Sequence, residues 1–209
     1  MFNFKIYFMS EQSPLSLGTE DIKKLLMRYA VPAIVAMTAA SLYNMMDSIF
    51  IGHGVGALGI AGLAVTFPFI NLAAAFGSLV GVGASTLVSV KMGQKDLKSA
   101  EAVLGNVLLL NTVIGFLFMT VCLIFLDPIL YFFGASADTL PYARDYMKVI
   151  LYGNLITHIY MGLNEVMRAS GYPQRAMMAT LFAVLINGVL NALFIFVLDM
   201  GIKGAALGT

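Results

Sequence analysis

The chain has 209 residues, of which 60% are hydrophobic and only 11% are charged, and its formal net charge is +1. Soluble domains carry roughly 25% charged residues, and a chain this apolar cannot hide its surface in a soluble core. The composition excludes a soluble enzyme, a nucleic-acid-binding protein with a basic patch, and a disulfide scaffold, because Cys122 is the only cysteine. It predicts an all-α integral membrane protein whose surroundings are the lipid bilayer.

Long stretches without charge predict the membrane spans, since about 18 or more such residues can cross a bilayer as a helix. No Asp, Glu, Lys or Arg occurs in residues 29–46, 48–90, 102–126, 149–164 or 176–198. The stretch 48–90 is too long for one span, and the glycines of residues 52–59 predict a turn within it.

Five transmembrane helices and the start of a sixth follow from this pattern. The predicted helices cover about residues 22–51, 58–90, 99–126, 142–169 and 174–198, and a sixth begins near residue 204. Asp96 is the expected N-cap of the third helix, and Pro32 is expected to kink the first. Residues 127–141 are expected to form a loop.

The chain divides into a polar cytoplasmic tail, residues 1–20, and a transmembrane lobe, residues 21–209. The first residues lack the small-residue cleavage site of a signal peptide, and either Met1 or Met9 is compatible with a natural start. The lobe is expected to be truncated, because six residues of helix reach only about 9 Å. A fragment, a truncated gene and a natural half-protein all remain open.

The basic residues predict the orientation, because cytoplasmic loops are enriched in Lys and Arg. With the N-terminus inside, nine of the 12 basic residues lie on the cytoplasmic side: Lys5, Lys23, Lys24, Arg28, Lys91, Lys95, Lys98, Arg168 and Arg175. The other three, Arg144, Lys148 and Lys203, lie outside. The N-terminus is therefore expected on the cytoplasmic side of the membrane.

Asp47 is the strongest candidate for a functional residue, because it is the only acidic residue between Asp21 and Asp96. A charge within a span costs roughly 2.5–3.5 kcal/mol at the bilayer centre and therefore indicates a function. Tyr43 and Asn44 share its helix face, which predicts a site for a proton or a small cation, Na⁺ included. The alternative is an interfacial Asp that caps the turn at Gly52.

Several polar residues in the other spans have two interpretations each. Asn187 and Asn191 lie four apart on one helix face and either join two helices or line a site. His158 is expected to be a packing residue rather than a proton relay, and Glu165 with Arg168 an ion pair that is mainly structural. Gly77 and Gly81 predict a close approach between two helices.

Four segments together resemble the N-terminal half of a multidrug and toxic compound extrusion (MATE) transporter, in particular its bacterial DNA-damage-inducible-like branch. They are Asp47-Ser-Ile-Phe-Ile-Gly52, Gly81-Val-Gly-Ala-Ser85 with Met92-Gly93, Arg168-Ala-Ser-Gly171, and Asn187-Gly-Val-Leu-Asn191 followed by residues 201–209. The order and spacing of these segments across five spans carry the resemblance, which covers about residues 20–209.

The resemblance implies two pseudo-symmetric six-helix lobes, of which this chain is the first, so that the C-terminal lobe is an expected partner. It implies a cation site between the first, fifth and sixth helices, formed by Asp47, Asn187 and Thr209, with Asn191 where some relatives have a second Asp. Tyr43, Tyr146 and Asn164 correspond to cavity or network positions, and Pro32 to the bend of the first helix.

The expected function is antiport rather than catalysis: H⁺ or Na⁺ enters while amphipathic, often cationic, organic compounds leave. No cofactor and no resident metal are expected, and nothing in the sequence selects the substrate or the coupling ion. The alternatives are a lipid or oligosaccharide flippase of the same superfamily, which would need basic residues in its cavity, and a structural membrane subunit, which would not need Asp47 in a polar cluster.

Overall fold

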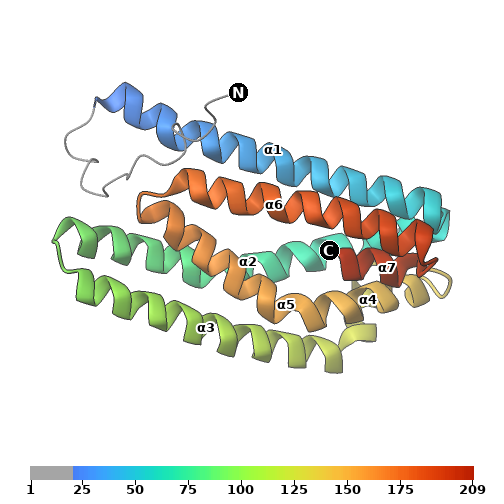
Figure 1. The fold of residues 1–209 in the computed structure, drawn as a ribbon. Coiled ribbons are helices and arrows are strands. Elements are labelled where there is room, and N and C mark those ends of the chain that lie inside the picture. The colour runs from blue at the N-terminus through green and yellow to red at the C-terminus, as the bar shows by residue number, and fades with distance from the viewer. Residues whose placement is uncertain (1–20) are drawn as a thin grey trace, which may run out of the picture.

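The computed structural model describes residues 21–209, and within this range the chain is helical (Figure 1). The predicted tail and the choice between Met1 and Met9 lie outside the described residues. The elements are α1 (Ile22–Gly54), α2 (Ala57–Gly93), α3 (Leu97–Ile124), α4 (Leu126–Phe132), α5 (Leu140–Ala169), α6 (Pro173–Ala192), the π-helix η2 (Leu193–Val197) and α7 (Gly201–Gly208).

The long helices form two groups, and long helices that follow one another in the chain run in opposite directions. In Figure 1, α1 and α6 lie side by side, and α5 lies between them and α3. Helix α5 packs most extensively against α2 and next against α3, so it forms the centre of the second group. We refer to the two ends of the bundle as the Ile22 end and the Gly54 end, after the ends of α1.

The predicted class, five spanning helices and the beginning of a sixth, is confirmed. Within residues 21–209, four helices are long and apolar enough to cross a membrane: α1, α2, α3 and the continuous segment Pro173–Val197. Helix α5 has 30 residues, and its polar side chains Asn154, His158 and Asn164 are buried inside the bundle. Placing polar side chains inside and apolar ones outside is the arrangement that a bilayer requires.

The turns fall where the sequence predicts them. Helix α1 continues through Pro32 to Gly54, and Gly56 adopts φ +92°, a conformation that favours glycine, before α2 begins. Gly201, at φ +57°, reverses the chain between η2 and α7. The second of these turns brings α7 back against the bundle, where it contacts α5 and α6.

One expectation about secondary structure is wrong, and one predicted span contains a feature that the sequence did not indicate. The predicted loop 127–141 contains α4, a helix whose Leu126 and Leu130 are buried in the core. The fifth predicted span ends as a π-helix, η2, whose Ile195 is buried. Hydrophobic packing decides both features, and the periodicity of the sequence does not distinguish a single π-turn from an α-turn.

The main hydrophobic core lies at the Gly54 end. Its most deeply buried members, all at most 2% exposed, are Ile51, Phe69, Leu130, Ala143, Tyr146, Met147, Leu151, Ile195 and Ala205. A smaller cluster of Ala84, Val88, Val107 and Val166 joins α2, α3 and α5 toward the Ile22 end. The tightest packing is therefore at the Gly54 end of the bundle.

Glycine contacts hold α2, α3 and α5 together. A Cβ atom on Gly81 would stand 2.7 Å from the Cα of Gly162, so the backbones of α2 and α5 touch as Gly77 and Gly81 predict. The fully buried His158 packs against Gly77 and Gly115, and its Nε2 donates to the carbonyl oxygen of Ala73 at 3.0 Å. The expectation that His158 is a packing residue agrees with this environment.

Asp96 caps α3 as predicted, since its Oδ1 accepts a hydrogen bond of 3.1 Å from the backbone N–H of Ser99. That hydrogen bond lowers the pKa of Asp96 below its ordinary value of 3.8. The cap therefore contributes its full stability above the ordinary pKa, and this stability is lost as the pH falls through the lowered pKa.

We expect Asp96→Ala to lower the thermal midpoint at pH 7 and to have no effect below the lowered pKa of Asp96, as measured by circular dichroism in detergent. Asp138→Ala, at an exposed position, is the control, and an equal loss in both variants would contradict the cap.

Candidate functional site

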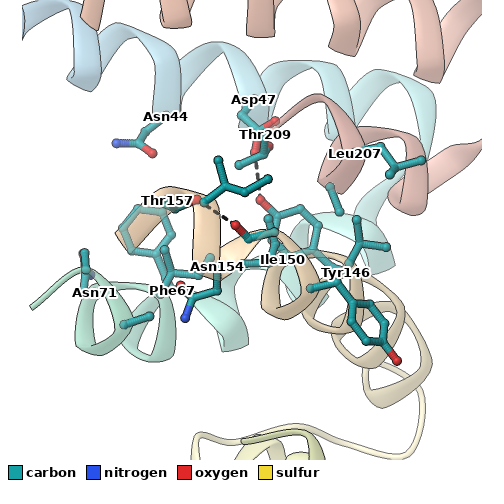
Figure 2. Close-up of a pocket in the computed structure, with 18 of the residues that line it drawn as sticks. Asn44, Asp47, Phe67, Asn71, Tyr146, Ile150, Asn154, Thr157, Leu207 and Thr209 are labelled. Carbon is teal, nitrogen blue, oxygen red and sulfur yellow. Dashed lines mark hydrogen bonds between the residues drawn. The ribbon is translucent and has the colours of Figure 1, made fainter. Parts of the chain in front are cut away.

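Asp47 is the only acidic side chain in the described residues that is buried within the bundle, and it is 5% exposed. Its Oδ1 accepts a hydrogen bond of 2.8 Å from Asn191 Nδ2, and its Oδ2 accepts one of 3.4 Å from the hydroxyl of Tyr146. Three helices, α1, α5 and α6, thus meet at one carboxylate. Figure 2 shows two of these residues, Asp47 and Tyr146. Both donors are neutral.

The structure excludes a capping role for Asp47. Helix α1 continues for seven residues beyond it, to Gly54, and its C-cap is Val55. The carboxylate is turned into the bundle, where its partners belong to other helices. The desolvation of a carboxylate that has neutral partners alone is only partly compensated, so the binding of a proton or a monovalent cation is favoured.

Helix α7 completes the cluster from the far end of the chain. Asn187 Nδ2 donates to the carbonyl oxygen of Gly208 at 2.6 Å, and Asn191 Nδ2 also donates to Asn187 Oδ1 at 3.2 Å. Gly208 packs directly against the Asn191 carboxamide, leaving no room for a Cβ atom. Asn191 Oδ1 is buried and has no hydrogen-bond partner among the described residues, so it is an available oxygen beside Asp47.

A cavity of about 760 Å³ opens on this cluster. Its wall includes Tyr43, Asn44, Asp47, Tyr146 and Thr209 from the predicted set, together with Phe67, Ile70, Asn71, Ile150, Asn154, Thr157, His158, Met161 and Leu207. Figure 2 shows Thr209 beside Asp47 and above Tyr146. The wall is mainly apolar and aromatic, and none of the residues that line it is Lys or Arg.

The other predicted site residues lie at different places. Asn44 lines this main cavity, although its amide donates to Ala40 of its own helix at 3.1 Å. Asn164 follows Asn154 on α5 by a helical rise of about 15 Å, and it donates to the carbonyl oxygen of Ala176 on α6 at 3.2 Å. Pro32 is buried within α1 and does not line the main cavity. The cluster therefore unites Asp47, Asn187, Asn191, Tyr146 and α7, while Asn164 belongs to a second polar network.

The cavity residues that were missed from the sequence include Asn154, Thr157 and Leu207. Asn154 and His158 lie four apart in a charge-free stretch, which is the same signal that singles out Asn187 and Asn191. Asn154 is 5% exposed, and its Nδ2 has no hydrogen-bond partner among the described residues. Leu207 gave no signal, because a leucine in an apolar helix does not reveal which face it presents.

No group of three or more His, Cys, Asp or Glu side chains in residues 21–209 is arranged to hold a metal ion. One carboxylate with neutral oxygens and amides around it can bind one proton or one monovalent cation. The geometry thus supports reversible cation binding beside a largely apolar cavity.

These features define a multi-pass helical membrane protein with a buried carboxylate on the wall of a large apolar cavity, the construction of a transporter lobe. Residues 32–193 match the MatE family, so the chain belongs to that family. It corresponds to the N-terminal half of a MATE transporter.

Relatives with known names and structures agree with this assignment. The chain is 29% identical over 201 residues to the multidrug export protein MepA of Staphylococcus haemolyticus, covering 96% of this chain and 44% of that protein. It is 34% identical to the MATE multidrug transporter DinF-BH, solved in complex with a ligand, with a TM-score of 0.87, covering 96% of this chain and 45% of that one. An outward-facing MATE transporter gives a TM-score of 0.88 at 28% identity, covering 96% of this chain and 44% of that one. The chain thus spans less than half the length of these relatives.

Proposed function

We propose that this chain is the cation-binding lobe of an antiporter that exports amphipathic, often cationic, organic compounds in exchange for H⁺ or Na⁺. The observation that carries the proposal is Asp47: a buried carboxylate with only neutral donors, on the wall of a cavity of about 760 Å³. Asn187, Asn191 and Thr209 would orient the carboxylate and offer neutral oxygens to Na⁺. The substrates and the second lobe are part of the proposal.

The main cavity suits such substrates by its composition. Aromatic and aliphatic side chains accept flat apolar molecules with little directional demand, and Asp47 supplies the one negative charge for a cation. The names of the relatives, a multidrug export protein and a multidrug transporter, support the same substrate class. A flippase for anionic headgroups is less well supported, because no Lys or Arg lines this cavity.

Cation entry can supply the driving force. A monovalent cation that crosses a potential of roughly 100 mV releases about 2.3 kcal/mol, and one pH unit adds about 1.4 kcal/mol for a proton. The sum, about 3.7 kcal/mol, supports a several-hundred-fold substrate gradient by the rule of about 1.4 kcal/mol per tenfold. The cation and the substrate need not touch, provided that they favour opposite conformations.

The test of this function is transport by the complete transporter that contains this lobe, purified and reconstituted in vesicles. We expect an imposed pH or Na⁺ gradient to drive accumulation of a fluorescent cationic dye, and one of the two ions to suffice. Dye movement that is indifferent to both gradients would contradict cation coupling.

We further propose that the Ile22 end faces the cytoplasm in the bacterial inner membrane, because the basic residues of the polar turns concentrate there. Lys91, Lys95 and Arg175 lie at the Ile22 end, whereas Arg144 and Lys203 lie at the Gly54 end. In a Cys122→Ala background, a single cysteine at His53 should react with an impermeant thiol reagent added outside, and one at Lys95 should not. The reverse labelling pattern would invert the topology.

A further inference from the structure

A second cavity, of about 340 Å³, continues from the Asp47 cluster toward the Ile22 end. It lies among α1, α5 and α6 and shares Tyr43, Met161 and Thr209 with the main cavity. Asn187, which Asn191 links to Asp47, also lines it. Polar surface is therefore continuous from Asp47 into this second cavity.

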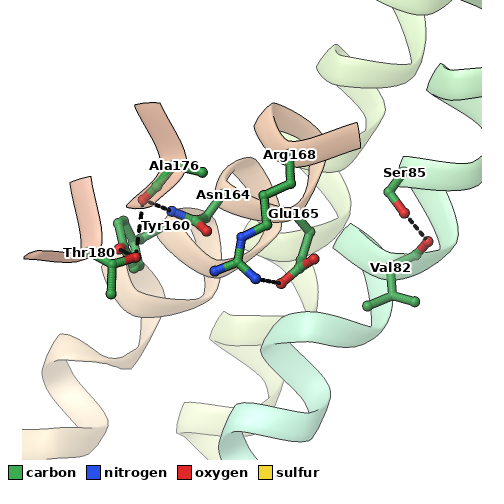
Figure 3. A network of polar contacts seen from close by, with 8 residues as sticks. All are labelled: Val82, Ser85, Tyr160, Asn164, Glu165, Arg168, Ala176 and Thr180. Atoms are coloured by element: carbon green, nitrogen blue, oxygen red, sulfur yellow. Dashed lines mark hydrogen bonds and ion pairs between the residues drawn. The ribbon is translucent and has the colours of Figure 1, made fainter. Parts of the chain in front are cut away.

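Hydrogen bonds between α5 and α6 form one wall of the second cavity (Figure 3). The Tyr160 and Thr180 hydroxyls lie 3.1 Å apart, and Asn164 Nδ2 donates to the carbonyl oxygen of Ala176 at 3.2 Å. The volume is enough for several waters, since each occupies about 30 Å³ in the liquid. Hydroxyl and amide groups on the wall give such waters partners.

Two charged side chains, Glu165 and Arg168, lie on the wall of this cavity, and no other residue that lines it is charged. Each is 33% exposed, and Arg168 NH1 lies 3.7 Å from Glu165 Oε1. Both belong to α5, so the pair does not join two helices. An i,i+3 pair on one helix contributes little to stability, so stability is a weak reason for placing two charges on the wall of a membrane-protein cavity.

The position of Glu165 along α5 suggests another role. Glu165 follows Tyr146, a partner of Asp47, by 19 positions on α5, a helical rise of about 28 Å. Asp47 is the only acidic residue that lines the main cavity, and Glu165 is the only acidic residue that lines the second cavity. A cation that leaves Asp47 toward the Ile22 end meets no other carboxylate on these walls.

We propose that Glu165 is a relay for the coupling cation at the cytoplasmic mouth of the lobe, receiving the cation from Asp47 and passing it to the cytoplasm. This inference rests on the proposed function. In the proton case, the carboxylic acid of Asp47 gives its proton through cavity water to the Glu165 carboxylate, which then gives it to water on the cytoplasmic side. In the sodium case, Na⁺ exchanges the oxygens of Asp47 for those of Glu165.

The surroundings of Glu165 favour release of the coupling cation over its retention. When a cation neutralises Glu165, the Arg168 charge loses its partner and repels that cation. Few other charged residues lie on the helices around Glu165. Helix α1 has no charged residue between Arg28 and Asp47, and α2 has none before Lys91. On α6, Arg175 lies in the first turn. The facing titratable side chain on α5 itself is Tyr160.

The experiment compares two transport modes in vesicles that contain the complete transporter, using the fluorescent dye as probe. In the Glu165→Gln variant we expect gradient-driven dye transport to fall by about tenfold or more, because a relay group is lost. Exchange of dye for dye at equal ion concentrations on both sides should keep its wild-type rate, since no cation has to be released. Separate arms with a pH gradient and with a Na⁺ gradient identify which cation uses the relay.

Matched variants separate this role from a structural one. Glu101→Gln changes an exposed acid near the same end of the bundle, outside both cavities, and should transport normally. Glu165→Asp keeps the carboxylate and should recover most of the driven rate. Equal loss of driven transport and exchange in Glu165→Gln, or no loss of either, would overturn the relay. Failure of the wild-type protein to couple dye transport to either gradient would instead overturn the proposed function.

Discussion

Asp47→Asn is expected to abolish cation-coupled export by the complete transporter while leaving membrane insertion and folding intact. The substitution keeps the size of the side chain and one oxygen, but it removes the negative charge that a proton or Na⁺ would neutralise. Because the partners of Asp47 are neutral donors, at 2.8 Å from Asn191 and 3.4 Å from Tyr146, no buried cation is left unpaired. The measurement is gradient-driven dye transport in vesicles, with thermal stability in detergent as the check on folding.

Two further variants define the role of Asp47. Asp138→Asn changes an exposed carboxylate and should transport at the wild-type rate. Asn191→Ala removes a neutral donor and the available Oδ1, so it should weaken coupling less severely than Asp47→Asn. Wild-type transport by Asp47→Asn together with an inactive Asn191→Ala would show that the coupling site is assigned to the wrong residue.

The sequence predicts the helical architecture well because a bilayer imposes a simple rule. Every span must be long and nearly free of charge, and every charge must lie in a turn or inside the bundle. The predicted limits of α2 and α5 accordingly differ by at most three residues from the observed ones. Asp47 stands out for the same reason, as a lone acid in a long apolar stretch.

Contacts between distant helices could not be predicted from the residues alone. The bond from Tyr146 to Asp47 joins residues 99 positions apart, and the bond from Asn191 to Asp47 joins residues 144 positions apart. Only the family resemblance placed Asn187, Thr209 and Asp47 together. The second cavity was not anticipated either, because Glu165 and Arg168 have the spacing of an ordinary surface ion pair.

Gly208 illustrates a different limit. A glycine near a helix end usually indicates a turn or a cap, and the sequence offers no reason to separate Gly208 from Gly204. The structure shows that the Gly208 carbonyl accepts from Asn187 and that its Cα packs on Asn191. The need for glycine there comes from a contact with a side chain 17 positions earlier.

Gly162→Ala is expected to destabilise the lobe more than Asp96→Ala or Asn191→Ala. Gly162 lies on α5 where α2 and α3 also meet, and its Cα is the atom that α2 approaches at Gly81. A new methyl group would overlap the Asn111 amide and stand 3.2 Å from Val107 Cγ1. Asn111 is fully buried, so the helices must separate to accept the methyl group, and overpacking of this kind costs about 1–3 kcal/mol.

A second substitution, at Asn111, should restore the stability that Gly162→Ala loses. The two polar side-chain atoms of Asn111 have no hydrogen-bond partner in the described part of the chain, so Asn111→Ala breaks no hydrogen bond there and leaves space beside Gly162. The double variant Gly162→Ala/Asn111→Ala should therefore recover most of the thermal midpoint that Gly162→Ala loses, a non-additive result expected for side chains in contact. Gly153→Ala, on the same helix with open space around its Cα, is the control and should be neutral or slightly stabilising. Thermal unfolding in detergent compares the wild type with four variants: Gly162→Ala, Asn111→Ala, the double variant and Gly153→Ala. Strictly additive losses would show that the Gly162 and Asn111 positions are not in contact.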